Sequence, residues 1–369
     1  MATYTAKWLY NWLVSDIQRL SLSTCKVHTV EVKVKENFEP RTLTILGSQV
    51  KQEIADRLKD NLRSLSTLKK NGHKVGALKH KSYVNSIPFK QHGITYRLDS
   101  ARNRVRIQKL GKFRVIGLHQ IPDNAEIANA MLIRKPSGYY LHITCYLPKD
   151  SCASKNLFNM DIGIDFGISS KLTLSNGIKI DFEIYETARL KQLQRKLART
   201  QYGSKNRDKV RYLLRKEYGK LNNRRKDAQN KVLAYLRCYK TAAFQDDSVK
   251  GWTSLFGRQV HSSGIGGLKT RLSTSLETPI PMAKSEPTTS ECFKCGKRHK
   301  LALSDRIISC DCGWRCDRDI NAALVILRKG LGLSPKEAVG LDRPELKPLE
   351  RETAARILGS NPYICVSFP

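Results

Sequence analysis

The sequence predicts an α+β protein with several domains and a polyanionic partner. Its 369 residues are enough for two or three domains with apolar cores, and 40% of them are hydrophobic. Segments with helical periodicity and segments with strand-like alternation follow one another along the chain. Lys and Arg number 66 against 33 acidic residues, which gives a formal net charge of +33. A polyanion that releases its counterions on binding is therefore the expected partner.

Composition excludes other classes of protein. No apolar run approaches the roughly 18 residues that a bilayer crossing needs. The start, MATYTAKWLYNWLV, lacks the small-residue cleavage site of a secretory signal. We therefore expect a cytoplasmic protein without a membrane partner. Nucleic acid is the first candidate for the polyanion, and an anionic membrane surface is the second.

Residues 1–155 combine helical and strand patterns. KWLYNWLVSDI has helical periodicity, and Val50, Ile54, Leu58 and Leu62 recur at four-residue steps. From about residue 83 to 148 the pattern changes to short alternating runs such as RVRIQKL and YYLHITCYL. This part is predicted to be a helix-plus-sheet domain.

A second unit opens near residue 159. MDIGIDFGISSKLTLSNGIKI predicts two strands joined by a tight turn at residues 175–177. Two basic helices follow within residues 186–238, and the stretch 189–231 holds sixteen Lys or Arg against three acids. Because a solvated helix face usually mixes charge signs, we expect these helices to contact a nucleic-acid backbone. The apolar positions are Leu190, Leu193 and Leu197 on the first helix and Val210, Leu213, Leu214 and Leu221 on the second. The candidate nucleic-acid contacts are Arg189, Arg195, Lys196, Arg199, Arg207 and Lys250.

The remaining pattern is weaker. TAAFQDD predicts a buried strand that runs into carboxylates, and QVHSSGIGGLKTRL predicts a further helix. Beyond Gly330 we expect a poorly ordered tail over residues 331–369, with a short helix near 350–358.

Four cysteines near residue 300 predict a zinc site. Cys292 pairs with Cys295 and Cys310 with Cys312, fourteen residues separate the pairs, and a glycine follows each pair. Two such knuckles supply four thiolates to a tetrahedral Zn²⁺. Cys316 is the alternative to Cys312, because C-D-C is one residue shorter than the usual C-x-x-C. A chance cluster of buried free cysteines is the non-functional alternative.

Two aspartates are candidate magnesium ligands. Asp165 lies at the end of an apolar strand in IGIDFG, beside glycines that would let a phosphate backbone come close. Asp319 begins an apolar helix in DRDINAALVIL, where its ordinary role would be an interaction with the helix dipole. Each alone is more often structural than catalytic. Together, in a basic protein, they suit a two-magnesium site that hydrolyses phosphodiesters.

Taken together, these motifs resemble the TnpB family of transposon-encoded, RNA-guided DNA nucleases, relatives of the type V CRISPR effectors. MDIGIDFG, the basic helix pair with GSKNR, FQDDSVKGW, EPTTSECFKCG and CDRDINAA occur in that order, and the match runs from about residue 8 to 330. The resemblance implies a RuvC-like nuclease domain of RNase H fold over 156–287 and 317–330, with a zinc ribbon inserted at 288–316. It also implies an N-terminal wedge and recognition lobe of helices and β-barrel strands over 1–155, which holds guide RNA and target DNA. The host would be prokaryotic, and the protein would associate with its nucleoid.

The resemblance also assigns the carboxylates. Asp165 would be the first catalytic magnesium ligand and Asp319 the last, with Asp317 as the competitor for the last role. The family's middle glutamate is replaced by Gln245, whose amide cannot supply a full negative charge to Mg²⁺. In such members a glutamate from the strand before the zinc ribbon can take its place. Glu286 matches that position if its strand neighbours the one that ends at Asp165.

Alternatives remain for the third carboxylate and for the function. Asp247 is the other donor, and a site with neither carboxylate is the third possibility. The expected function is Mg²⁺-dependent, RNA-guided cleavage of DNA next to a short flanking motif. Gln245 and the short stretch before the first helix motivate a nuclease-inactive, RNA-guided repressor instead. A basic zinc-ribbon protein without a guide is the least specific alternative. We expect Gln245→Ala to be comparatively mild.

Overall fold

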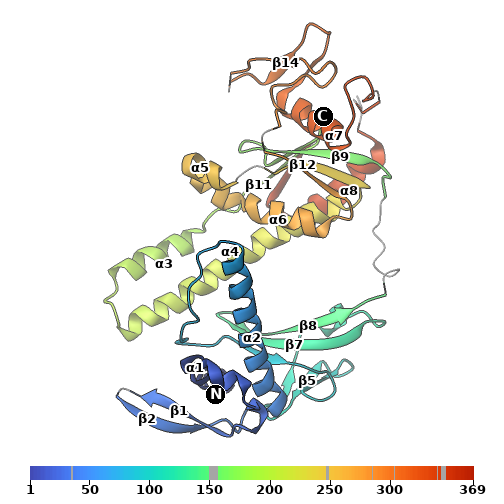
Figure 1. Ribbon diagram of the computed structural model, residues 1–369. Helices are drawn as coiled ribbons and strands as arrows, with labels where there is room; N and C mark the ends of the chain where they lie inside the picture. Colours follow the sequence, from blue (N-terminus) through green and yellow to red (C-terminus); the bar gives the residue numbers. More distant parts are fainter. Residues whose placement is uncertain are drawn as a thin grey trace. The chain divides into compact units, whose positions relative to one another are not determined.

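The computed structural model divides into two compact units, Met1–Ala153 and Ser154–Pro369 (Figure 1). It describes residues 1–34, 36–148, 157–246, 249–284, 286–302, 304–338, 340–341 and 346–369, without the side chains of Lys250, Leu255 and Arg258. Within these ranges, no helix combines the length and the apolar character that a membrane span requires.

The first unit packs two helices against short strands. Helices α1 (Ala2–Ser15) and α2 (Ser48–Lys70) place Leu9, Leu13, Val50, Ile54 and Leu58 in one apolar core, as the four-residue spacing predicts. The strands are β1 (Thr29–Val34), β2 (Asn37–Thr42), β3 (Ser86–Phe89), β4 (Tyr96–Asp99), β5 (Arg104–Ile107), β6 (Gly111–Arg114), β7 (Glu126–Lys135) and β8 (Gly138–Tyr146). They form a β1-β2 hairpin and two open sheets, β3-β7-β8 and β4-β5-β6. The expectation of a β-barrel is therefore wrong for the described strands.

The second unit is built on one six-stranded sheet. Its strand order is β13-β12-β9-β10-β11-β16. Strand β9 is antiparallel to β10 and parallel to β12, and β12 is parallel to β13. The bounds are β9 (Asp161–Phe166), β10 (Leu172–Leu174), β11 (Lys179–Phe182), β12 (Thr241–Gln245), β13 (Pro279–Met282) and β16 (Ile364–Ser367). The segment predicted as two strands thus forms three, because the chain already turns back between Phe166 and Leu172.

Helices of this unit pack on the sheet or on one another. They are α3 (Ala188–Arg199), α4 (Lys205–Leu236), α5 (Val249–Ser263), α6 (Ile265–Ser275), α7 (Arg318–Gly330) and α8 (Pro348–Leu358). The main core lies on the sheet face to which Ile162 and Ile164 of β9 point, and it includes residues of α4 and α6. Helix α7 contacts β9, β10, β12 and β13 and packs on the other face, where Ala243 of β12 meets Ile326.

The expected disorder of the tail is wrong for residues 346–369. Strand β16 pairs antiparallel with β11 and so completes one edge of the sheet. Helix α8 packs against α4 and carries Glu350, which is 1% exposed. The Glu350 carboxylate accepts hydrogen bonds from the Tyr239 hydroxyl at 2.9 Å and from the Asn176 amide at 3.1 Å. These contacts link residues far apart in the sequence, which local patterns do not reveal.

Candidate metal centres and nucleic-acid interface

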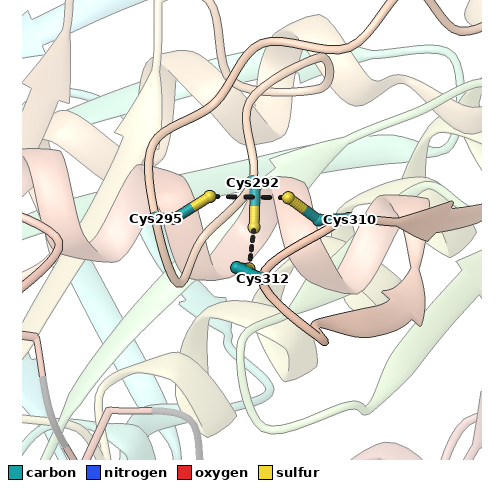
Figure 2. Close-up of side chains that lie close together, drawn as sticks. All are labelled: Cys292, Cys295, Cys310 and Cys312. Carbon is teal, nitrogen blue, oxygen red and sulfur yellow. Dashed lines mark hydrogen bonds between the residues drawn. The ribbon is translucent and has the colours of Figure 1, made fainter.

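The four predicted cysteines converge on one point. The Sγ atoms of Cys292, Cys295, Cys310 and Cys312 all lie within 4.8 Å of one another (Figure 2). The Cys292–Cys312 and Cys295–Cys310 sulfur pairs are 3.7 and 3.4 Å apart. Zinc–sulfur bonds of about 2.3 Å place tetrahedral sulfurs about 3.8 Å from one another. The cluster therefore has the size of a Zn²⁺ site, and Cys316 stands outside it.

Local backbone geometry builds both knuckles. The Gly296 N–H donates to the Cys292 carbonyl, and the Gly313 N–H donates to the Cys310 carbonyl, each at 2.9 Å. Both glycines have positive φ, +76° and +84°, which L side chains rarely adopt. The predicted glycine turn after each cysteine pair is thus confirmed. Strands β14 (Ile307–Ser309) and β15 (Arg315–Asp317) form the ribbon that carries the second knuckle to α7.

The thiols differ in acidity. Burial raises the pKa of Cys292 to about 12, whereas the hydrogen bond from the Trp314 backbone N–H helps to lower the pKa of Cys312 to about 7. A zinc-coordinating thiol is deprotonated outright. The pKa of Cys295 is raised as well, so a bound Zn²⁺ would stabilise two thiolates that the protein alone disfavours.

Side chains of α7 bind the first knuckle directly. The Asn321 side-chain oxygen accepts from the Phe293 N–H at 3.1 Å and from the Trp314 indole N–H at 3.0 Å, and its nitrogen donates to the Glu291 carbonyl at 2.7 Å. Arg328, buried at 2% exposure, pairs with the Glu291 carboxylate and donates to the Phe293 carbonyl. The ribbon and α7 are thus held as one piece.

Asn321 and Arg328 are not among the residues that the sequence predicted for this site. A signal was present, because an amide and a guanidinium interrupt an otherwise apolar helix, and buried polar groups require partners.

Asp165 and Asp319 come from elements that pack on one face of the sheet. A Cβ built on Gly163 would lie 2.0 Å from the Ala323 carbonyl oxygen, so this glycine lets α7 approach β9. The expectation that the glycine there admits a phosphate backbone is wrong for Gly163. Since side chains alternate along a strand, Asp165 faces the same side as Gly163. Asp319 lies in the first turn of α7, one turn before Ala323.

Asp317 has a structural role. Its Oδ1 accepts from the N–H groups of Asp319 and Ile320 at 2.9 and 3.2 Å, which caps α7. Its Oδ2 lies 2.8 Å from the Lys179 ammonium of β11. Both Asp317 oxygens are therefore engaged, whereas Asp319 has the Arg318 Nε 3.9 Å from its Oδ1.

Glu286 does not lie at the position that the sequence predicts. Strand β13 pairs with β12, which separates it from β9, so the expected pairing beside the Asp165 strand is wrong. Glu286 lies in a bend four residues after β13, is 48% exposed, and sits 3.2 Å from the Lys329 ammonium. Among the described residues, only the four cysteines form a group of three or more potential metal ligands within 4.8 Å. Asp165, Glu286 and Asp319 do not form such a group.

Gln245 holds the bend that carries Glu286. Its side-chain nitrogen donates to the carbonyl oxygens of Ala283, Lys284 and Glu286 at 3.2, 3.1 and 2.7 Å. Its side-chain oxygen accepts from the Thr288 hydroxyl at 3.1 Å. A glutamate there would have no proton to donate when ionised. The alternative donor, Asp247, lies outside the described residues.

The basic helices form a hairpin, with α3 alongside the N-terminal half of α4 (Figure 1). Arg195, Lys196 and Arg199 are exposed on α3. Arg189 is 65% exposed, with its Nε 3.5 Å from Glu217. Arg207 instead donates to the Leu197 and Thr200 carbonyls at 2.9 and 2.8 Å and so closes the turn between the helices.

Leu213 and Lys250 are the remaining predicted residues of this region. Leu213 is 38% exposed, so its assignment to the apolar stripe is wrong. The Lys250 side chain lies outside the described part of the chain.

This geometry defines a mixed α/β protein with a four-cysteine ribbon that could hold zinc, fastened to the helix that packs on its main sheet. Two family profiles match segments that lie mostly in the second unit. They are "Probable transposase" (OrfB_IS605) at residues 145–243 and "Cas12f1-like, TNB domain" at residues 279–326, which include the four cysteines. These profiles cover segments that carry the motifs by which the sequence resembles the TnpB family.

One curated relative and one solved structure are similar to the chain. The relative, from Streptomyces pristinaespiralis, is named "Putative RNA-guided DNA endonuclease" and is 30% identical over 226 residues. The match covers 58% of this chain and 56% of the relative, so the chain spans little more than half of that protein's length. The solved structure is a Cas12f1–sgRNA–target DNA complex, with 14% identity, a TM-score of 0.38, and coverage of 74% of this chain and 70% of that one.

Proposed function

We propose that this chain is an RNA-guided DNA endonuclease whose six-stranded sheet and α7 form a RuvC-like nuclease domain of RNase H fold. The observation that carries the proposal is the packing of α7 across Gly163, which places Asp319 on the helix above the strand face of Asp165. The two matching family profiles and the name of the curated relative support the same activity. Guide pairing would supply sequence specificity, while the protein holds the backbone of the hybrid.

Asp165 and Asp319 are the residues that would hold Mg²⁺. The ion supplies charge at the scissile phosphate and an activated water. The protein contributes the two carboxylates, which lie on a strand and on a helix that pack closely together. Arg328 and Asn321 tie α7 to the zinc ribbon, so the ribbon would fix the position of Asp319.

Glu286 is our candidate for the third carboxylate. The bend that carries it is fixed by Gln245 directly at the end of β12, which is parallel to and adjacent to β9. Lys329 holds the Glu286 carboxylate in the free protein. Catalysis therefore requires Glu286 to leave this partially exposed ion pair, which is an inexpensive step because such pairs are worth about 0–1 kcal/mol.

The test begins with the RNA that copurifies with the full chain. One discrete species is expected, and with Mg²⁺ it should direct cleavage of duplex DNA that carries a matching target. Heterogeneous RNA and no guided binding would overturn the proposal and favour a zinc-ribbon protein without a guide.

A matched pair of variants tests the third carboxylate. Glu286→Gln is expected to abolish cleavage and retain guided DNA binding, whereas Glu277→Gln, an exposed acid at the other end of β13, should cleave normally. Normal cleavage by Glu286→Gln would show that this assignment is wrong.

A nuclease-inactive repressor is the second candidate. The observations that favour it are the amide at position 245 and the dispersed carboxylates among the described residues. Guided binding by the wild-type protein, with no cleavage at any Mg²⁺ concentration, would decide for the repressor.

A further inference from the structure

A small cationic cavity lies in the first unit. Its volume is about 60 Å³. Helix α1, helix α2 and the segment that leads into β3 form its wall. The lining residues are Ala6, Tyr10, Ile54, Arg57, Leu58, Asn61, Lys81, Val84 and Ser86. Two of them are cations, Asn61 and Ser86 add neutral hydrogen-bonding groups, and none is acidic.

The helices and the connecting segment set the positions of both cations. Arg57 shares one face of α2 with Ile54, Leu58 and Asn61, at steps of three and four residues, and the apolar members of that face enter the core. Lys81 is fixed at its backbone, because the Asn11 side chain accepts from the Lys81 N–H at 2.8 Å and donates to its carbonyl at 2.9 Å.

The Lys81 ammonium is also held in place. It lies 4.1 Å from the centroid of the Tyr10 ring, a favourable cation–π arrangement. This contact restrains an exposed side chain that would ordinarily sample many rotamers, so a ligand would have less rotamer entropy to remove.

The charges of Arg57 and Lys81 are left unbalanced at short range. Within the described residues, neither cation has an acidic oxygen within 4.0 Å, although neighbouring Asp56 and Asp60 pair with Lys90 and Arg63. Burial and the Arg57 charge together lower the pKa of Lys81. An anion bound between the two cations would offset the effect of the Arg57 charge on the pKa of Lys81.

We propose that this cavity, between Arg57 and Lys81, binds one phosphate group of a nucleic-acid strand. The cavity has more room than the roughly 10–15 Å³ that a single water needs on the same measure, so it can admit a ligand group larger than water. A forked guanidinium, an ammonium, an amide and a hydroxyl are groups that bind phosphate oxygens. The choice of a strand phosphate rests on the proposed function and on the net charge of +33.

The first measurement uses inorganic phosphate as the probe and the full chain. We expect phosphate to raise the unfolding temperature of the wild-type protein more than that of the Arg57→Gln/Lys81→Gln double variant. The matched control is Arg63→Gln/Lys70→Gln, which removes the same charge from exposed positions of α2 outside the cavity. The control should respond to phosphate as the wild type does.

The second measurement uses labelled copurified RNA over a range of salt concentrations. The cavity double variant should bind about 10-fold more weakly than the control variant, with a log K against log salt slope shallower by about 0.7 to 0.9. If it loses the phosphate response but binds RNA like the control, the cavity takes a free ion and the strand assignment is wrong. If it matches the control in both measurements, the site itself is wrong.

These readouts are independent of cleavage. Failure of the wild type to cut guided DNA would refute the nuclease proposal and leave both results on the cavity unaffected.

Discussion

The cysteine ribbon and the carboxylate site differ in how completely the protein builds them. The four thiols lie within 4.8 Å of one another, on knuckles closed by local hydrogen bonds. The three carboxylates come from a strand, a bend and a helix, and Glu286 is held by Lys329. The four cysteines are already gathered as a zinc site requires, whereas the proposed carboxylate site depends on how the sheet, α7 and the bend pack. Variants at the two sites should therefore fail in different ways.

The largest effect is expected at the carboxylates. Asp165→Asn and Asp319→Asn should each lower guided DNA cleavage by more than about 100-fold, since even the outer hydrogen-bond partners of metal ligands are worth 10- to 100-fold. Guided binding, measured by gel shift, should stay within about 3-fold of wild type. Asp317→Asn is the matched control: its amide oxygen can still cap α7, so it should lose only the ion pair with Lys179, about 0–1 kcal/mol. Equal loss of cleavage in all three variants would remove the distinction between Asp317 and Asp319.

Removal of a zinc ligand should act on stability first. Cys292→Ser and Cys312→Ser are expected to lose the single zinc per chain, and the ribbon should unfold locally, because binding of a structural zinc contributes directly to folding. Cleavage should fall as well, since Asn321 and Arg328 would lose the knuckle that they bind. Metal analysis with protease sensitivity measures both effects. Zinc retained by Cys312→Ser but lost from Cys316→Ser would move the fourth ligand to Cys316.

Gln245 tests whether an amide is required at the end of β12. Gln245 makes four side-chain hydrogen bonds. We therefore expect Gln245→Ala to lower the free energy of unfolding by about 2–4 kcal/mol, and no longer expect its effect to be mild. Gln245→Glu should be at least as harmful, because an ionised carboxylate would face three carbonyl oxygens. Denaturant unfolding measures both. A Gln245→Glu variant that is stable and cuts faster than wild type would contradict this role.

The smallest effect is expected on the α3–α4 hairpin. Arg195→Glu with Arg199→Glu should weaken nucleic-acid binding by about 10-fold, with a shallower salt dependence and unchanged sequence preference. Arg207→Gln should mainly lower the stability of the turn, because its guanidinium donates to backbone carbonyls. An unchanged salt slope in the double charge reversal would remove the hairpin from the binding surface.

Local sequence patterns predicted the features that neighbouring residues build. The knuckles at Cys292 and Cys310 depend on a glycine a few positions away, and the helices α2, α3 and α4 depend on apolar spacing over a few turns. The resemblance to the TnpB family rested on the order of short motifs, and the two family profiles cover the same segments. The roles of Asp165 and Asp319 stay predictions, although the structure places both on elements that pack together.

Long-range pairing was beyond those patterns. The position of β13 beside β12, and not beside β9, decides where Glu286 lies, and no local motif encodes which parallel strand is the neighbour. In the same way, the pairing of β16 with β11 and the burial of Glu350 turned a segment without clear periodicity into part of the core.

The sequence by itself determined the charge, the thiol ligands and the two candidate aspartates, because each is a property of residue type and short spacing. Only the tertiary structure decided that Gly163 admits α7, that Gln245 holds a bend of carbonyls, and that Arg328 is buried against the ribbon. Each of these roles depends on contacts between segments distant in the chain. Such contacts form only when the whole core packs, since the cost of a buried amide or guanidinium without its partner excludes other arrangements.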